Sequence, residues 1–340
     1  MLSRRTVTIA LIVMMAILVT LVLTLLTNQS SRLLSLAAAM PRGLLSRAFK
    51  HLVQDSILTV PFWIAIAITL ALQTLTPARG EQKIFSRALA EDGVWFVYEA
   101  VLQSIIIVTY VDLLARLYGK YASFLTVTSL NQLPGWLRFL IAILLVDFLY
   151  WVQHYLHHKI PFLWKLHSLH HSQTELNFFT DFRYHVLEYV VRHTVLIIPL
   201  LILKIDVPVI AAVAITQRWY SRFYHGNIRT NLGPLRYFLV TPQSHRIHHS
   251  IEPQHGDQNF GAIFSIWDFV FGTVSSDFSS YPQTGIADSE FPHRTSGKLS
   301  ALLSAPLHQM AYPFRQRKRP ATAITSETLK KYDSRLPGSL

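Results

Sequence analysis

Long apolar runs occupy much of the first two thirds of the chain. The first, from Thr6 to Leu26, is almost unbroken Val, Ile, Leu, Ala and Met behind Arg4 and Arg5. Its roughly 20 residues are enough to cross about 30 Å of hydrocarbon as a helix. The pattern therefore predicts an N-terminal membrane anchor within residues 1–30. A cleaved signal peptide is the alternative, since it would share the basic start, but this run is longer than a signal core.

The later apolar runs predict further helical segments. Three of them cover residues 57–75, 94–117 and 136–151. The last of these is short for a span and ends in polar residues. A fourth run, residues 190–215, is interrupted by Lys204, Asp206 and Pro208. These breaks favour a hairpin or a re-entrant pair over one straight crossing.

Polar interruptions divide the rest of the chain. The stretch from Ser31 to Val53 mixes Arg and Lys with Leu, Ala and Phe around a Pro-Arg-Gly break, which predicts an interfacial amphipathic segment. Residues 31–135 are therefore predicted to hold this segment and transmembrane helices. Strand patterns are scarce and no repeat of fixed period occurs. The predicted fold is all-α: an integral-membrane helical bundle with a cytoplasmic, histidine-rich helical cap.

The composition agrees with a membrane protein. Hydrophobic residues make up 51% of the 340 positions and charged residues 15%, which is too apolar for an ordinary soluble enzyme. The net charge of +12 favours contact with anionic lipid over binding of nucleic acid. Basic residues on both sides of the predicted spans leave the orientation ambiguous. The basic tail in residues 274–340 favours a cytoplasmic C-terminal half, and a solvated, partly disordered tail is the other interpretation.

Cysteine and histidine contents restrict the chemistry. The chain has no cysteine, which excludes disulfides, thiolate-bound clusters and cysteine nucleophiles. It has 16 histidines. A metal bound here must use imidazoles and carboxylates, a ligand set that suits iron, zinc, copper or nickel.

Three histidine clusters share the pattern H-x-x-H-H. Residues three and four apart lie on one face of a helix, so each triplet is predicted to aim three rings at one point, as half of a metal site. By composition a single such triplet is expected only about 0.04 times, so three copies are a strong signal. The clusters are His154-Tyr-Leu-His157-His158, His167-Ser-Leu-His170-His171 and His245-Arg-Ile-His248-His249.

With its flanking motifs, this part of the chain resembles the fatty acid hydroxylase or sterol desaturase superfamily of integral-membrane non-haem diiron oxygenases. The resemblance covers roughly residues 136–273, where we expect the catalytic domain. The first histidine box of that family is H-x-x-x-H, which selects His154 and His158 and leaves His157 a supporting or structural role. The other matching motifs are Asp147-Phe-Leu-Tyr-Trp, Arg183-Tyr-His185, His225-Gly-Asn227, Thr241-Pro-Gln-Ser-His245, Asn259-Phe-Gly261 and Trp267-Asp-Phe-Val-Phe-Gly272-Thr.

The resemblance implies two non-haem iron ions with O2 as co-substrate, and no catalytic side chain beyond the metal ligands. The candidate carboxylates that would orient the ligand rings are Asp147, Glu188, Asp257 and Asp268. The implied ligands are His154, His158, His167, His170, His171, His185, His225, His245, His248 and His249.

The function implied by the resemblance is a membrane diiron oxygenase that hydroxylates or otherwise oxidises a lipid or sterol-like substrate. The histidine boxes follow directly after apolar runs, so we expect a multi-pass protein with its site at the cytoplasmic boundary of the membrane. No nicotinamide or flavin fingerprint is present. A separate electron donor of the cytochrome b5 or ferredoxin type is therefore expected, and no nucleic acid.

Two other functions would also use clustered histidines. A zinc hydrolase is disfavoured because no H-E-x-x-H motif supplies a general base beside the ligands. A non-enzymatic metal transporter or sensor would place its ligands within the spans to line a path, whereas here the clusters begin where the apolar runs stop.

Overall fold

The computed structural model describes residues 60–287, 291–292 and 299–314. Within these ranges the regular elements are helices, so the all-α prediction is confirmed, and strand-like pairing is limited to isolated bridges. The predicted anchor within residues 1–30 and the predicted interfacial segment from Ser31 to Val53 lie outside the described residues. Much of the basic tail does as well.

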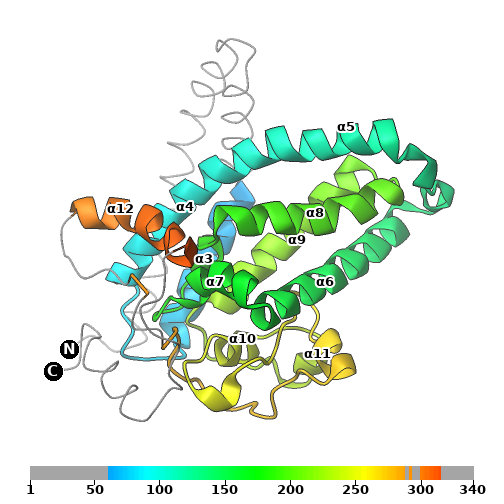
Figure 1. Ribbon diagram of the computed structural model, residues 1–340. Coiled ribbons are helices and arrows are strands. Elements are labelled where there is room, and N and C mark those ends of the chain that lie inside the picture. The colour runs from blue at the N-terminus through cyan, green and yellow to red at the C-terminus, as the bar shows by residue number, and fades with distance from the viewer. Residues whose placement is uncertain (1–59, 288–290, 293–298, 315–340) are drawn as a thin grey trace.

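Long helices form the larger part of the molecule, and the short helices lie at their left and lower sides in Figure 1. The long α4 and α5 are joined by a π-helical turn at Ile107–Val111 and make a continuous rod that contacts α8. Helix α6 packs against both α8 and α9. The long elements are α3 Val60–Leu75, the rod of α4 Arg87–Ile106 and α5 Asp112–Tyr121, α6 Gly135–Lys159, α8 Val186–Ile202 and α9 Val207–His225. The short ones are α7 Pro161–His171, α10 Pro242–His248, α11 Ile266–Phe271 and α12 Leu299–Met310.

The helices follow the predicted apolar runs closely. Run 57–75 contains α3, and run 94–117 lies in the rod of α4 and α5. Run 190–215 is a helical hairpin rather than one crossing, because the chain reverses between α8 and α9. Lys204 in this turn has a φ of 47°, in the left-handed region, which a continuous right-handed helix excludes. Helix α12 lies within residues 274–340, where the sequence indicates a basic tail rather than a helix.

Helix α6 is longer than predicted, with 25 residues against the 16 of the apolar run. At 1.5 Å per residue it measures about 37 Å, enough for the roughly 30 Å of a bilayer core. Among the described residues it is the one helix that is both long and apolar enough to cross a membrane. Trp136 and Leu140 on it are exposed, whereas Ala142 and Val146 pack into a core with Val213 of α9. The first histidine box forms its last turns.

A sharp break between α6 and α7 brings the first two histidine boxes together. Ile160 is extended, with φ −96° and ψ 117°, because the residue before a proline avoids the helical region. Pro161 then starts α7, where its missing N–H costs no hydrogen bond. The chain therefore changes direction, and His171 of α7 meets His158 of α6 with their Nε2 atoms 3.1 Å apart.

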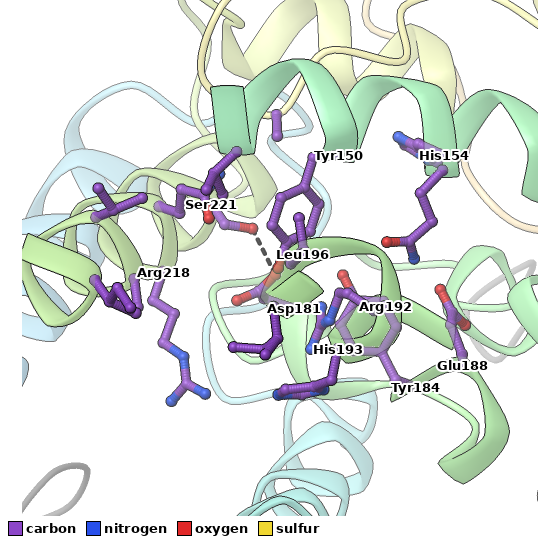
Figure 2. Close-up of a pocket in the computed structure, with 18 of the residues that line it drawn as sticks. Tyr150, His154, Asp181, Tyr184, Glu188, Arg192, His193, Leu196, Arg218 and Ser221 are labelled. Carbon is purple, nitrogen blue, oxygen red and sulfur yellow. Dashed lines mark hydrogen bonds between the residues drawn. The ribbon is translucent and has the colours of Figure 1, made fainter. Parts of the chain in front are cut away.

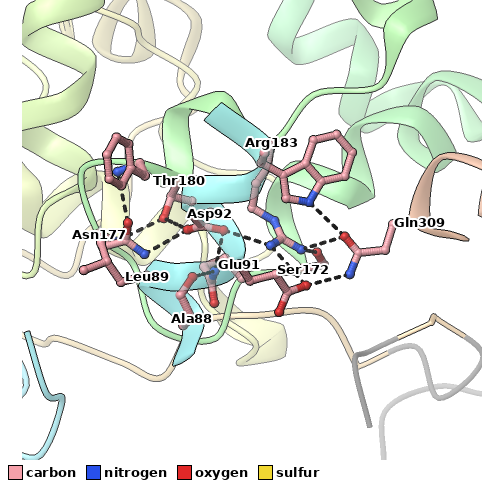
Figure 3. Close-up of polar contacts among 12 residues, drawn as sticks. Ala88, Leu89, Glu91, Asp92, Ser172, Asn177, Thr180, Arg183 and Gln309 are labelled. Atoms are coloured by element: carbon pink, nitrogen blue, oxygen red, sulfur yellow. Dashed lines mark hydrogen bonds and ion pairs between the residues drawn. The ribbon is translucent and has the colours of Figure 1, made fainter. Parts of the chain in front are cut away.

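A buried polar network connects α4 with the segment that follows the second box (Figure 3). Asp92 of α4 is fully buried and accepts four hydrogen bonds. The donors are Gln173 Nε2 at 2.7 Å, Asn177 Nδ2 at 2.8 Å, Thr180 Oγ1 at 2.9 Å and Arg183 Nη1 at 2.8 Å. The carboxylate is thus fully satisfied, as a buried charge must be.

The same network reaches α12. Gln309 Oε1 accepts hydrogen bonds from Trp95 Nε1 at 3.0 Å and from Arg183 Nη2 at 3.2 Å. Arg183 Nη2 also donates to Ser172 Oγ at 2.8 Å, directly after the second box. Helix α12 therefore helps to fix the position of the second histidine box.

Candidate metal centre

Nine of the ten predicted ligands come together at the end of the long helices. They form two groups, and in each group the candidate ligand nitrogens lie within 4.8 Å of one another. The two groups touch, since the rings of His171 and His249 stack with centroids 4.3 Å apart. The first histidine group is His154, His158, His167, His171 and His248, and the second histidine group is His170, His225, His245 and His249.

The expectation that each H-x-x-H-H triplet aims at one point was wrong. In the second box, His167 and His171 belong to the first histidine group and His170 to the second. In the third box the division is reversed, because His245 and His249 join the second group and His248 the first. Successive residues on a helix are rotated by about 100°, so positions i and i+4 share a direction that i+3 leaves. One box therefore serves two neighbouring sites.

The first histidine group presents free nitrogen lone pairs. His154 Nδ1 lies 2.9 Å from the carbonyl oxygen of Phe260, and His248 Nδ1 lies 2.8 Å from that of Gln258. A neutral ring that donates from Nδ1 has a lone pair on Nε2. The Nε2 atoms of His154, His167 and His248 are buried and have no hydrogen-bond partner within the described part of the chain. Such converging, orphaned lone pairs fit a metal ion.

The spacing in the second histidine group also fits a metal ion. The Nε2 atom of His225 lies 3.2 Å from Nε2 of His170 and 2.8 Å from Nε2 of His245. The Nε2 atom of His249 lies 3.0 Å from that of His245. Nitrogens at about 2.1 Å from an ion and at right angles to each other are about 3.0 Å apart, against about 3.4 Å in a tetrahedron. The observed distances are therefore close to those between nitrogens bound to a single ion.

Burial lowers the pKa of several of these rings. Removal from water, to which the neighbouring imidazoles add, holds the pKa of His170 and His249 well below the usual value. Burial lowers the pKa of His248 to about 3. A lowered pKa leaves the ring unprotonated at neutral pH, which is the form that binds metal.

Two of the four candidate carboxylates contact ligand rings. Glu188 Oε1 accepts from His167 Nδ1 at 2.8 Å, and both side chains are buried. Asp257 Oδ1 lies 3.5 Å from His158 Nδ1, while its other oxygen accepts from Lys159 Nζ at 2.6 Å. Glu188 is thus placed to fix the tautomer and direction of His167.

The other two carboxylates act on the loop before α11. Asp268 accepts from the backbone N–H groups of Phe260 and Gly261 at 2.8 and 2.9 Å. Asp147 accepts from the N–H of Ile263 at 2.7 Å. These bonds hold the loop whose Phe260 carbonyl contacts His154. Backbone acceptors such as this carbonyl carry no side-chain signal, so they cannot be identified from the sequence.

His185 lies outside both histidine groups. It is the N-cap of α8, where its Nδ1 accepts from the N–H of Leu187 at 3.1 Å. Its Nε2 lies 3.0 Å from the carbonyl oxygen of Met310 in α12. With both ring nitrogens engaged, His185 has no lone pair to offer a metal. His157 is also outside both groups, with Nδ1 2.7 Å from the carbonyl oxygen of Gln153.

A cavity of about 540 Å³ leads from the histidines into the long helices. This volume is in the range of small-molecule binding sites. Its lining includes His154 and His170 at one end and Leu196, Leu200 and Ile210 among the apolar side chains of α8 and α9. Polar residues occupy the wall as well, and Figure 2 shows Tyr184, Glu188, Arg192 and Asp181 among them.

Glu188→Gln is expected to weaken metal binding about 10- to 100-fold, the usual effect of losing a partner of a ligand histidine. The amide keeps the shape but loses the charge that favours the Nδ1–H tautomer of His167. Metal titration of the purified protein followed by absorption spectroscopy measures the change. Asp257→Asn is the matched comparison, because its longer contact with His158 is exposed to water, and it should have the smaller effect. Unchanged affinity in Glu188→Gln would contradict this role.

Known proteins share this region of the chain. The family model for fatty acid hydroxylases matches residues 139–273. An ornithine lipid hydroxylase, OlsE, of Rhizobium tropici is 28% identical over 189 residues, 56% of this chain and 54% of that protein. Alkylglycerol monooxygenase of Homo sapiens is 34% identical over 136 residues, 40% of this chain and 30% of that protein. The Caenorhabditis elegans alkylglycerol monooxygenase is 31% identical over 135 residues, 38% of this chain and 26% of that protein.

These matches support the resemblance to the fatty acid hydroxylase superfamily that the histidine motifs indicated. The matched segment runs from α6 to the end of α11 and carries all nine clustered histidines. The chain spans about a quarter to a half of the length of these curated relatives. No solved structure gives a significant match.

Proposed function

We propose that this protein is an O2-dependent lipid monooxygenase with two non-haem irons. The observation that carries the proposal is the pair of adjoining histidine groups at the end of a largely apolar cavity. The proteins that share residues 139–273 are named as lipid hydroxylases or monooxygenases, which supports the same reaction class.

The histidines of the two groups would hold the metal ions. Two bound irons would supply the oxidation of an unactivated C–H bond with O2, which side-chain acids and bases cannot perform. The protein's own residues prepare the site. Glu188 and the carbonyl of Phe260 orient His167 and His154, and burial lowers the pKa of His170, His248 and His249.

The number of donors supports iron over zinc. Five nitrogens in the first histidine group exceed the four of a closed zinc site and the three protein ligands of a catalytic one. Imidazole-rich sites with higher coordination suit iron. A zinc hydrolase also requires a general base beside the metal, and Glu188, the carboxylate nearest the first group, is already bonded to His167.

We propose a membrane location with the substrate entering from the lipid phase. Helix α6 is long enough to cross a bilayer and ends in the first histidine box, so an acyl chain could reach the cavity without passing through water. A multi-pass arrangement with the histidines facing the cytoplasm and a separate cytochrome b5- or ferredoxin-type electron donor complete the proposal. The basic residues of the tail would attract an acidic donor.

The decisive experiment compares lipid extracts from cells that express the full chain with extracts from cells that do not. We expect a lipid that has gained one oxygen atom, and that atom should carry the label when cells are grown under 18O2. The purified protein should contain about two irons per chain. A single zinc with no labelled product would overturn the proposal and favour the hydrolase.

A further inference from the structure

Two arginines line the cavity without a carboxylate partner. Arg192 of α8 and Arg218 of α9 face it, and in the described part of the chain neither has a carboxylate oxygen within the 4.0 Å of an ion pair. The carboxylates that line the cavity make no direct ion pair with either arginine. Glu188 holds His167, Asp181 accepts from Ser221, and the buried Glu99 acts on both arginines only at longer range. A cation in a cavity wall that makes no direct ion pair can form one with an anionic ligand.

Arg192 is the arginine nearer the histidines. Its guanidinium carbon lies 4.7 Å from the ring centre of Tyr184 and 4.8 Å from that of Tyr189. Tyr184 stacks on His170 with an angle of 6° and centroids 4.9 Å apart, so a single ring separates Arg192 from the second histidine group. Figure 2 shows Arg218 on the far side of Asp181 from Glu188.

Ring contacts leave the hydrogen-bonding capacity of Arg192 available. Tyrosine faces stabilise a cation through their quadrupoles, but they do not use the five N–H donors of a guanidinium. Among the hydrogen bonds of the described residues none involves the Arg192 side chain, and this side chain lines the cavity. A carboxylate or phosphate could accept two parallel hydrogen bonds there.

The rest of the lining sets the direction of a ligand. The apolar side chains of Leu196, Leu200 and Ile210 provide a wall for an acyl chain. A ligand lying the other way would place its charge among these side chains, at a cost that no hydrogen bond offsets.

We infer that Arg192 binds the anionic group, carboxylate or phosphate, of an amphipathic substrate whose acyl chain lies along the apolar wall of α8 and α9. The inference also has a consequence for the reaction, which rests on the proposed lipid oxidation. The oxidised carbon should lie within a few bonds of the anionic group. Oxidation near the far end of the acyl chain is excluded, because Arg192 holds the anionic end beside the histidines.

The test is a binding measurement on the purified full chain in neutral detergent. Dodecyl phosphate and dodecanoate are compared with dodecanol, which has the same chain without the charge. The wild type should bind both anionic probes about tenfold or more tightly than dodecanol, the usual effect of a charge-assisted hydrogen bond. Arg192→Gln should lose this preference but bind dodecanol as the wild type does, and Arg192→Lys should keep part of it. Dodecanol binding also reports whether the variant is folded.

Controls separate the possible sources of an effect. Arg116→Gln, on an exposed arginine paired with Asp112, should leave the preference unchanged. Inorganic phosphate should compete poorly with dodecyl phosphate, and equal affinity would mean a free-anion site and overturn the lipid assignment. The inference is overturned if the wild type binds the anionic probes no more tightly than dodecanol. It is also overturned if Arg192→Gln keeps the wild-type preference for the anionic probes.

The binding test does not depend on metal or turnover, so the two proposals fail separately. A protein that prefers anionic probes but oxidises no lipid counts against the oxygenase only. A protein that oxidises lipid but does not prefer anionic probes counts against the Arg192 inference only. The same holds if tandem mass spectrometry places the new oxygen far from the anionic group.

Discussion

Replacing His248 or His170 by Ala is expected to abolish formation of the oxidised lipid and to lower the iron content below two per chain. His248 belongs to the first histidine group and His170 to the second, so each variant removes a donor from a different site. Losing even an indirect partner of a ligand costs about 10- to 100-fold in metal affinity, and loss of the donor itself should exceed that. Elemental analysis and lipid mass spectrometry measure the two effects.

His185→Asn is the matched control for this pair. It removes a histidine that family resemblance assigns to the metal but that the structure places at the N-cap of α8. Asparagine is itself a good N-cap, so helix stability should be preserved. We expect wild-type iron content in this variant. Iron loss as large as in His248→Ala would show that the ligand set extends beyond the two groups, and full activity of His248→Ala or His170→Ala would refute the ligand assignment.

Asp92→Asn is expected to lower the free energy of unfolding by about 3–5 kcal/mol, the usual cost of breaking a buried ion pair. The four groups that bond to Asp92 are all donors, so an amide N–H₂ would face donors where the carboxylate accepts. The substitution also leaves Arg183 buried without its main counter-charge. Thermal unfolding of the protein in detergent measures the loss.

Asp112→Asn provides the comparison for this prediction. Its pair with Arg116 is exposed and lies on one helix at i,i+4, so the expected loss is below about 1 kcal/mol. Iron content is a second measurement, because Arg183 also bonds to Ser172 directly after the second box. Equal stability of the two variants would show that the Asp92 network contributes nothing particular to the fold.

Several features of this protein followed from the sequence alone. The apolar runs predicted α3, the α4–α5 rod and the hairpin of α8 and α9, since helix formation in these runs depends on local periodicity and on breaks such as the turn at Lys204. Motif spacing and resemblance named ten candidate ligands, and nine of them lie in the two histidine groups. Arg192 could have been named as a candidate as well, because an ionisable residue within a long apolar run suggests a functional site.

Other features depend on tertiary contacts. How each box divides between the two histidine groups follows from the approach of α6, α7, α9 and α10, and spacing along one helix cannot show which ring faces which neighbour. The position of His185 was decided by α12, whose Met310 carbonyl occupies its second nitrogen. Local sequence thus determined which apolar runs form helices and which histidines are candidate metal ligands. Packing of distant segments determined which nitrogens share a site, because convergence depends on contacts between residues as far apart as His154 and His248.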